Sequence, residues 1–454
     1  MLPAILPSAS KIYSTLGNNN SLVPLAIKDV ANSIGLTTGS YIVGDKTEGK
    51  DRFIDEFGTQ AIWLFGIPAY KKLLDLTIFK SLGFDSEIDV RNLKNKDIFE
   101  KAKKYAPSQE IKEAFEKVGQ KQKTFKGLSL AKFGISTVMT IFTYWGLTKY
   151  RHKTTEENIK KELRAKAAAK KQQNSNNTFT SQMEPQNIKA FNDVHKKDKN
   201  NTSKPNFTGR IEDFMFSPVK NLMIVDGAIT TERLAESRNK QDFIGYAIKE
   251  GSFWAFMYFA GQKIQEHFEK KSEKKYNRSI DLDARVIESE ELKNSFKNKT
   301  LKDSLKAFDS AKTDSEIYEF IMKNPDNFVV QMAKKSDIIT TFKKGKLQGK
   351  IDTRKYIDIE EVKNVKTKLE KLNNQYTNSK LHQNKTEEEA LETFLAQVKK
   401  LKRISVIKNI GACIGALGVA APALMVAMRY LGKDNKDFQV KKDIEKKLAF
   451  ESAA

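Results

Sequence analysis

The chain of 454 residues has one cysteine, Cys413, and four histidines, and both shortages exclude classes of protein. A single cysteine can form neither an internal disulfide nor a cysteine-only metal site. Cys413 lies in an apolar run, where a free cysteine behaves as a small hydrophobe rather than a reactive thiolate. The histidines lie far apart without metal-ligand spacing, and we expect them on the surface: His152, His195, His267 and His382.

Motifs of catalysis and nucleotide binding are lacking too. No serine stands in a Gly-x-Ser-x-Gly elbow. Residues Tyr41–Asp51 have the spacing of a phosphate-binding loop, and Leu222–Asp226 could supply its acidic strand, but Asp51 stands where Ser or Thr should hold Mg²⁺. The carboxylate pairs near Glu360 and Glu387 are typical of solvated helix faces and caps. We therefore expect no enzyme and no catalytic, cofactor-binding or metal-binding site, and we identify no small-molecule substrate.

Acidic residues are outnumbered, with 57 Asp and Glu against 80 Lys and Arg and a net charge of +23. This excess favours a polyanionic neighbour, either anionic lipid or nucleic acid, although a lysine-rich soluble surface explains it equally well. No aromatic platform accompanies the basic runs, which disfavours nucleic acid. Cations beside the two long apolar segments are candidates for anionic lipid: Lys123, Lys126, Lys132, Lys399, Lys400, Lys402, Arg403 and Lys408.

Long apolar runs are few, and the mean hydropathy is −0.55. The strongest run, Asn409–Met428, has about 20 residues without a charge, the length that crosses a hydrocarbon core. Gly411, Gly415 and Gly418 lie near one face of it and are candidates for close helix packing. The N-terminus has no basic region before a long apolar stretch, so we expect no cleavable signal peptide. Any membrane insertion would use internal segments.

The second run, Phe133–Thr148, has about 16 residues and spans only if flanking lysines reach outward to the headgroups. Its Tyr144 and Trp145 suit a membrane interface. Two shorter runs, Ala61–Tyr70 and Gly251–Gly261, are typical of interfacial, re-entrant or core segments. Their aromatics are further interface candidates: Trp63, Phe65, Trp254 and Phe256. For all four runs the alternative is the core of a soluble helical protein.

The short runs resemble each other. Gln60–Phe65 contains Trp63 and is followed by Lys72, and Gly251–Phe256 contains Trp254 and is followed by Lys263 at the same distance. This similarity predicts a mainly helical, duplicated architecture, in which each half has a short aromatic segment and a longer apolar helix.

The predicted organisation has five parts. They are an N-terminal tail (1–21), a first half (22–152), a charged helix with a flexible polar linker (153–210), a second half (211–440) and a C-terminal tail (441–454). Within the second half, residues 282–400 form an insertion. Its apolar heptads, Val362–Tyr376 and Leu391–Leu401, predict an antiparallel helical hairpin, with a capping box beginning at Thr386.

These features favour a non-enzymatic protein integral to a cytoplasmic-type membrane, an anchored structural or scaffolding protein that engages anionic lipid or partner proteins. One alternative is a soluble helical scaffold whose apolar segments are buried. The other is an oligomeric transporter or pore built from duplicated halves. Two spans are too few for a monomeric pathway, and neither contains an acidic residue for a coupling ion.

Overall fold

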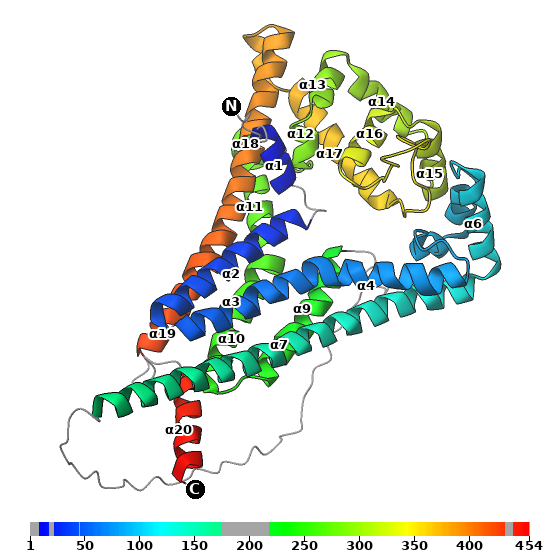
Figure 1. Ribbon diagram of the computed structural model, residues 1–454. Helices are drawn as coiled ribbons and strands as arrows, with labels where there is room; N and C mark the ends of the chain where they lie inside the picture. The colour runs from blue at the N-terminus through cyan, green and yellow to red at the C-terminus, as the bar shows by residue number, and fades with distance from the viewer. Residues whose placement is uncertain (1–8, 18–21, 45, 175–217, 432–438, 454) are drawn as a thin grey trace, which may run out of the picture.

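The structure is a computed structural model that describes residues 9–17, 22–44, 46–174, 218–431 and 439–453. The predicted mainly helical fold is confirmed, with 81% helix and no strand among the described residues. Most of the predicted polar linker, and His195 within it, lies outside the described residues. The helices form two packed regions that meet at the beginning of the long helix α7 and at the first part of α18 (Figure 1).

The first region, the long-helix body, contains the extended helices of both predicted halves. In chain order these are α2 (Val23–Val43), α3 (Lys46–Ala61), η1 (Ile62–Gly66), α4 (Ile67–Leu74), η2 (Asp75–Phe79), α7 (Gln122–Asn174), α9 (Pro218–Ala235), α10 (Lys240–Trp254), η4 (Ala255–Phe259), α11 (Ala260–Tyr276), α18 (Glu387–Ile414), η6 (Gly415–Ala420) and α19 (Ala421–Leu431). The short helices α1 (Ala9–Leu16) and α20 (Gln439–Ala453) pack at its edges.

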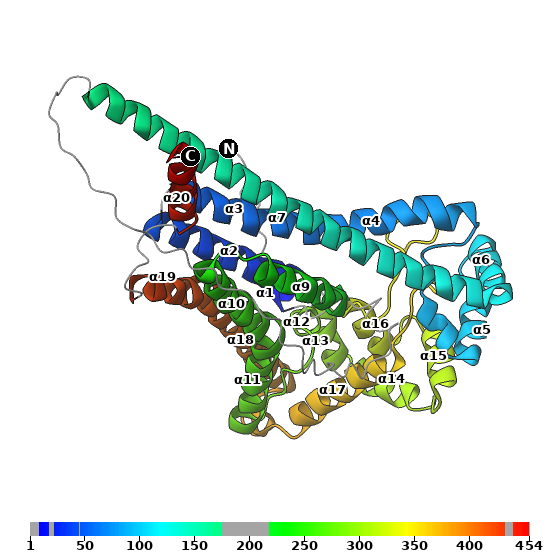
Figure 2. The ribbon, with the colours of Figure 1, turned by 90° about the horizontal axis from the view of Figure 1, so that it is seen from below.

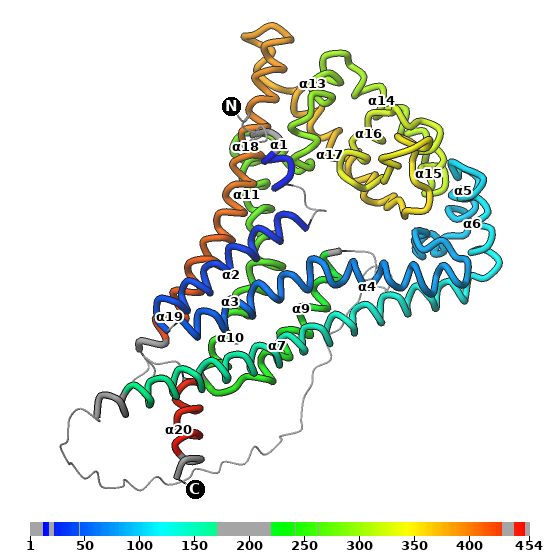
Figure 3. Tube along the Cα trace, in the orientation of Figure 1, coloured from blue at the N-terminus to red at the C-terminus, as the bar shows by residue number. Residues whose placement is uncertain are grey.

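Several of these helices join end to end. The π-helical turns η1 and η2 continue α3 through α4 into one rod, and η6 joins α18 to α19 (Figure 3). The rod of α3 and α4 runs antiparallel to α7, as both ribbon views show (Figures 1 and 2). A π-helical turn also follows α10, where η4 begins directly after Trp254.

The second region, the short-helix domain, contains η3 (Val90–Lys94), α5 (Lys96–Lys104), α6 (Gln109–Gln120), α12 (Ala284–Ile287), α13 (Glu290–Lys297), α14 (Thr300–Phe308), α15 (Asp314–Lys323), α16 (Phe328–Lys335), α17 (Ile359–Thr377) and η5 (Lys380–Gln383). Its core is apolar and conventional, with Phe115, Val329 and Phe394 fully buried. Residues 79–125 and 280–398 share this core, so the predicted insertion folds together with part of the first half.

The two heptad segments of the expected hairpin lie on α17 and α18, which follow each other in the chain. The capping box at Thr386 is present, with Glu389 as its partner. The helices meet at their turn, where the rings of Tyr376 and Phe394 lie 5.4 Å apart, and then diverge (Figure 1). The apolar seam of α17 packs against α14, α15 and α16, because these amphipathic helices offer a larger apolar surface than one partner helix could.

The polarity of the long-helix body is partly reversed. Its interior holds many polar side chains beside two small apolar clusters, around Leu417 and Val225, and its surface carries apolar side chains. On α7, Ser136, Thr140 and Tyr144 are buried, whereas Val138 and Phe142 are exposed, Phe142 at 64%. On α2 the buried face carries Lys28, Asp29, Asn32, Ser33 and Thr37, and the exposed face carries Val23, Ile27, Val30 and Ile34. Soluble proteins rarely expose such contiguous apolar faces.

Helices α2 and η6 cross at very short range. A Cβ placed on Gly35 would lie 2.1 Å from the carbonyl oxygen of Gly418, so the crossing requires glycine at this position of α2. Gly418 therefore lies at a close helix contact, as expected from the sequence. The same expectation fails within this chain for Gly411 and Gly415, where a Cβ would meet nothing within 4 Å.

Among the described residues, one helix is long and apolar enough to cross a membrane. It runs from Glu387 to Met428, its most apolar window has a mean hydropathy of 2.1, and 28% of that window is buried. The segment Phe133–Thr148 does not provide a second helix of this kind. It is the middle of the 53-residue α7, which continues as a charged helix beyond it.

Candidate functional site: a buried ionic network

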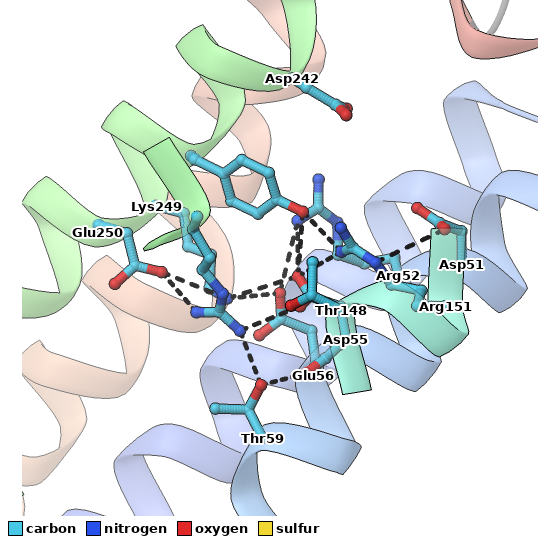
Figure 4. Close-up of polar contacts among 12 residues, drawn as sticks. Asp51, Arg52, Asp55, Glu56, Thr59, Thr148, Arg151, Asp242, Lys249 and Glu250 are labelled. Atoms are coloured by element: carbon cyan, nitrogen blue, oxygen red, sulfur yellow. Dashed lines mark hydrogen bonds and ion pairs between the residues drawn. The ribbon is translucent and has the colours of Figure 1, made fainter. Parts of the chain in front are cut away.

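The interior of the long-helix body holds a network of five cations and five carboxylates, which we call the ionic network. Figure 4 shows its part around Asp55. Its members are Asp51, Arg52, Asp55 and Glu56 from α3, Arg151 from α7, Arg233 from α9, Arg238 from the α9–α10 turn, and Asp242, Lys249 and Glu250 from α10. The helical spacing of three and four residues places the α3 members on one face of that helix.

Asp55 is the centre of the ionic network. Its carboxylate lies 3.0 Å from Arg151 and 3.2 Å from Arg233, and the Arg52 guanidinium approaches it at 3.5 Å. The hydroxyls of Tyr144 and Tyr246 donate to the two carboxylate oxygens at 3.4 Å each. One carboxylate thus connects α3, α7, α9 and α10.

Two further carboxylates flank this centre. Glu250 lies 2.5 Å from Arg233 and accepts a hydrogen bond from Thr230 at 2.8 Å. Glu56 lies 2.9 Å from the Lys249 ammonium. Lys249 and Glu250 are adjacent on α10, so that helix supplies one charge of each sign to the interior.

The other end of the ionic network is centred on Asp51. Its carboxylate accepts hydrogen bonds from Arg238 at 2.9 Å and from Thr155 at 2.6 Å. Arg238 also binds Asp242 at 2.7 Å, in the first turn of α10. This end therefore fastens the charged part of α7 to the turn between α9 and α10.

The charges shift one another's pKa values. Burial alone would raise the pKa of Asp55, but Arg151 and Arg233 outweigh it and hold that pKa well below its ordinary value. Burial would also raise the pKa of Asp51, but the charges of Arg151 and Arg238 outweigh it and lower that pKa. Burial and these same two arginines lower the pKa of His152 to about 4. Asp51 and Asp55 are therefore ionised, and His152 is neutral, at neutral pH.

Paired charges of this kind hold helices together. Five cations and five carboxylates neutralise one another, and each lies within 4 Å of a partner. Removing one partner from a buried pair leaves an uncompensated charge, which costs about 3–5 kcal/mol. With every carboxylate held by a cation, the arrangement is suited to fixing helix positions.

Two more buried carboxyls lie beside the ionic network, and aromatic donors contact both. Asp29 accepts a hydrogen bond from the Trp63 indole at 3.0 Å, and Asp226 accepts one from the Tyr258 hydroxyl. Burial, with the neighbouring charges of Asp29 and Glu250, raises the pKa of Asp226 to about 8 against the opposing Tyr258 hydrogen bond. A small cavity between these groups has room for about one water molecule.

The structure divides the predicted interface aromatics. The prediction is wrong for Trp63, which is 6% exposed, and for Tyr144, because their polar atoms bind Asp29 and Arg233 in the interior. Phe65 and Trp145 are exposed on the surface of the rod and of α7. Trp254 and Phe256 are half-buried, and the Trp254 indole donates to Thr230 at 3.0 Å.

The predicted lipid-binding cations are divided in the same way. Lys402 is a correction, since it is 2% exposed and its ammonium binds the Ile280 carbonyl at 2.8 Å and Glu269 at 3.2 Å. Three others form ion pairs: Lys132 with Asp75, Lys399 with Glu290 and Arg403 with Glu288. The remaining four are exposed: Lys123, Lys126, Lys400 and Lys408.

The remaining sequence features have structural places. Asp51, the departure from the phosphate-loop pattern, belongs to the ionic network, and Asp226 lies on helix α9 rather than on a strand. His267 and His382 are exposed, whereas His152 is half-buried against Arg151, contrary to the surface position expected. Among the described residues, no group of three or more His, Cys, Asp or Glu side chains is placed to hold a metal ion.

The ionic network was not predicted from the sequence. Charged residues at helical spacing, such as Asp51 and Asp55, are usually a solvated face. One signal was available: an apolar face at helical spacing opposite the polar face. On α7, Val138 and Phe142 form such an apolar face opposite Thr140 and Tyr144. Which face lies inside depends on the neighbouring helices.

Comparisons of the chain with protein-family models, with curated proteins and with solved structures found no significant match.

Proposed function

We propose that this protein is a non-enzymatic membrane-anchored scaffold. In this proposal the long-helix body is held in a bilayer, and the short-helix domain is presented at the membrane surface to lipid or partner proteins. The observation that carries the proposal is the partly reversed polarity of the long-helix body. Apolar faces lie on its outside, and ionised and hydroxyl side chains lie within.

The reversed polarity is physically reasonable in lipid. An exposed apolar face is costly in water at roughly 25 cal/mol per Å², whereas lipid tails solvate it. Buried hydroxyls such as Ser136 and Thr140 satisfy themselves by bonding backbone carbonyls one turn back on α7. Charged residues in membrane proteins typically face the bundle interior and pair there, as they do in the ionic network.

The dimensions of the apolar faces also support the proposal. The uncharged run 409–428 covers about 30 Å of helix, and exposed apolar residues of α7 run from Leu130 to Trp145 over about 22 Å. A hydrocarbon core is about 30 Å thick, so the first has the length of a span and the second needs Lys132 and Lys149 at the headgroups. We propose 409–428 and 133–148 as the two spans of a cytoplasmic-type membrane protein.

We also propose that the two halves share one plan. The supporting observation is that the related aromatic segments both contain π-helical turns, η1 at residues 62–66 and η4 at residues 255–259. Each turn follows a helix, α3 or α10, that contributes to the ionic network. A shared ancestral helix pair would account for both similarities.

Exposed cations would supply the contact with anionic lipid. Lys123 and Lys126 precede the proposed span of α7, and Lys400 and Lys408 precede that of α18. Each near-surface cation contributes about 1 kcal/mol of attraction to anionic lipid.

Two other functions compete with the anchored scaffold. One is a soluble scaffold whose apolar faces are covered by other copies of the chain, and the other is an oligomeric transporter or pore.

Cysteine labelling can test the anchor directly, because Cys413 is the only native cysteine. In a C413A background, single cysteines V138C and V419C would report the proposed lipid-facing surface, and K297C would report the exposed short-helix domain. We expect the protein to remain in membranes after alkaline carbonate washing. A maleimide should label K297C freely, but should label V138C and V419C only after detergent is added, since the reaction needs a hydrated thiolate.

Release by carbonate with full labelling of V138C and V419C would overturn the anchor. A soluble oligomer that protects both sites would favour the scaffold closed by its own copies.

A further inference from the structure

A cleft of about 550 Å³ opens between helices α2, α9, α11 and α18, away from the ionic network. Its volume lies within the range of small-molecule sites. Its lining has an apolar part, contributed by Leu25, Met223, Met257, Val406 and Ile410. The cleft brings together helices from both ends of the chain, so no local sequence pattern marks it.

Lys28 on α2 lines this cleft and is only 5% exposed. Its ammonium reaches toward α11, where a Cβ placed on Gly261 would lie 3.1 Å from the Lys28 nitrogen. Among the residues that the structure describes, none forms an ion pair or hydrogen bond with this ammonium. A buried cation without a partner is costly, and a bound anion would remove that cost.

The acidic residues of the cleft do not compensate Lys28. Glu269 binds Lys402 at 3.2 Å, and Asp281 binds Lys371 at 2.9 Å. Glu266 is exposed at the rim, where Lys220 and Lys368 also lie. The deep part of the cleft therefore combines one uncompensated positive charge with apolar lining residues, which excludes a cation and favours an amphiphilic anion.

We propose that this cleft binds a single-chain anionic amphiphile, an acyl chain that ends in a carboxylate or a phosphate. The anionic group binds the Lys28 ammonium at the α2–α11 contact, in the space that Gly261 leaves open. The acyl chain lies along Met223, Met257 and Val406. The proposal does not rest on the membrane anchor, because Lys28, Met223 and Met257 lie outside the proposed spans.

The test is native mass spectrometry and thermal unfolding of the purified full chain, in a detergent with an uncharged headgroup. The probes share a 16-carbon chain: hexadecanoate, hexadecyl phosphate and the neutral hexadecanol. We expect the anions to bind and raise the Tm, and hexadecanol to bind about tenfold more weakly or worse, because a charge-assisted hydrogen bond is lost. The carboxylate and phosphate arms identify which headgroup the cleft prefers.

Three variants distinguish binding in this cleft from nonspecific binding and from changes in overall stability. K28M should weaken anion binding about tenfold or more and should leave the unliganded Tm unchanged or higher, since it removes a costly buried charge. M223W should reduce binding of all three probes by filling the cleft. K263M is the matched control, because Lys263 is exposed on the same helix as Gly261 and does not line the cleft. Equal binding of acid and alcohol, or unchanged anion binding by folded K28M, would overturn the proposal.

Discussion

The guanidinium of Arg233 on α9 lies 3.2 Å from the carboxylate of Asp55 on α3, and both side chains are almost fully buried. The same guanidinium holds Glu250 on α10 at 2.5 Å. One side chain of the second predicted half thus fixes a helix of the first half to its own neighbour. The contact belongs to a body whose interior is ionic, which makes its charges structural elements of the fold.

Replacing Arg233 with methionine should therefore destabilise the protein strongly. R233M keeps the approximate volume but leaves Asp55 and Glu250 without one cation, which we expect to cost about 3–5 kcal/mol in the free energy of unfolding. The measurement is denaturant unfolding of the purified protein. E236Q is the control, since Glu236 pairs with Lys149 at the surface and such pairs contribute about 1 kcal/mol or less. Equal effects of the two variants would contradict a structural role for the ionic network.

Asp226 should make stability fall as the pH rises. Its folded-state pKa of about 8 lies above its ordinary value of 3.8, so the folded state binds this proton more tightly than the unfolded state. The stabilisation is fully present below pH 3.8 and is lost as the pH rises through about 8. Asp55 contributes no opposing slope above pH 5, because its pKa is lowered. His152, whose pKa is lowered to about 4, opposes this slope only below its ordinary value of 6.5. We expect the Tm to decline between pH 6.5 and pH 9.

The variant D226N should flatten that decline. Tyr258, Asp29, Glu250 and Arg233 face this carboxyl and remain in place. Burial raises the pKa of Asp29 to about 6, so Asp29 adds a decline below that pH, and D226N removes the part above it. D326N, at an exposed aspartate of the short-helix domain, should leave the pH dependence unchanged. A decline of the same steepness in D226N would assign the slope to another group.

The crossing of α2 and η6 should tolerate no side chain at Gly35. G35A places a Cβ 2.1 Å from the Gly418 carbonyl oxygen, so the helices must separate, and overpacking of this kind costs about 1–3 kcal/mol. G411A is the matched control, because its Cβ meets nothing within 4 Å. It should be neutral or stabilising by about 0.5–1 kcal/mol, since alanine favours helix. Thermal unfolding of both variants distinguishes a real crossing from a general effect of removing glycine.

Local structure could be predicted from the sequence, but which face of each helix is buried could not. The capping box at Thr386 and the apolar run ending at Met428 follow from residues close together in the chain, and both lie where they were predicted. Trp63 and Lys402 were misplaced because their burial depends on Asp29 and Glu269, which other helices bring to them. Helical spacing shows that a polar face exists, whereas only tertiary packing shows that it lies inside.

A charge on the exposed face of η6 should prevent membrane insertion if that face meets lipid. Val419 is exposed on η6, and V419D would place a carboxylate near the middle of the proposed span, where an aspartate costs about 2.5–3.5 kcal/mol. We expect V419D to be released by carbonate or degraded, whereas V419L should remain in the membrane. The control E392K carries a charge change on an exposed position of α18 outside the proposed span. In water an aspartate at an exposed site changes stability by about 0.5 kcal/mol or less. Normal yield and membrane retention of V419D would therefore place this face in water and contradict the anchor.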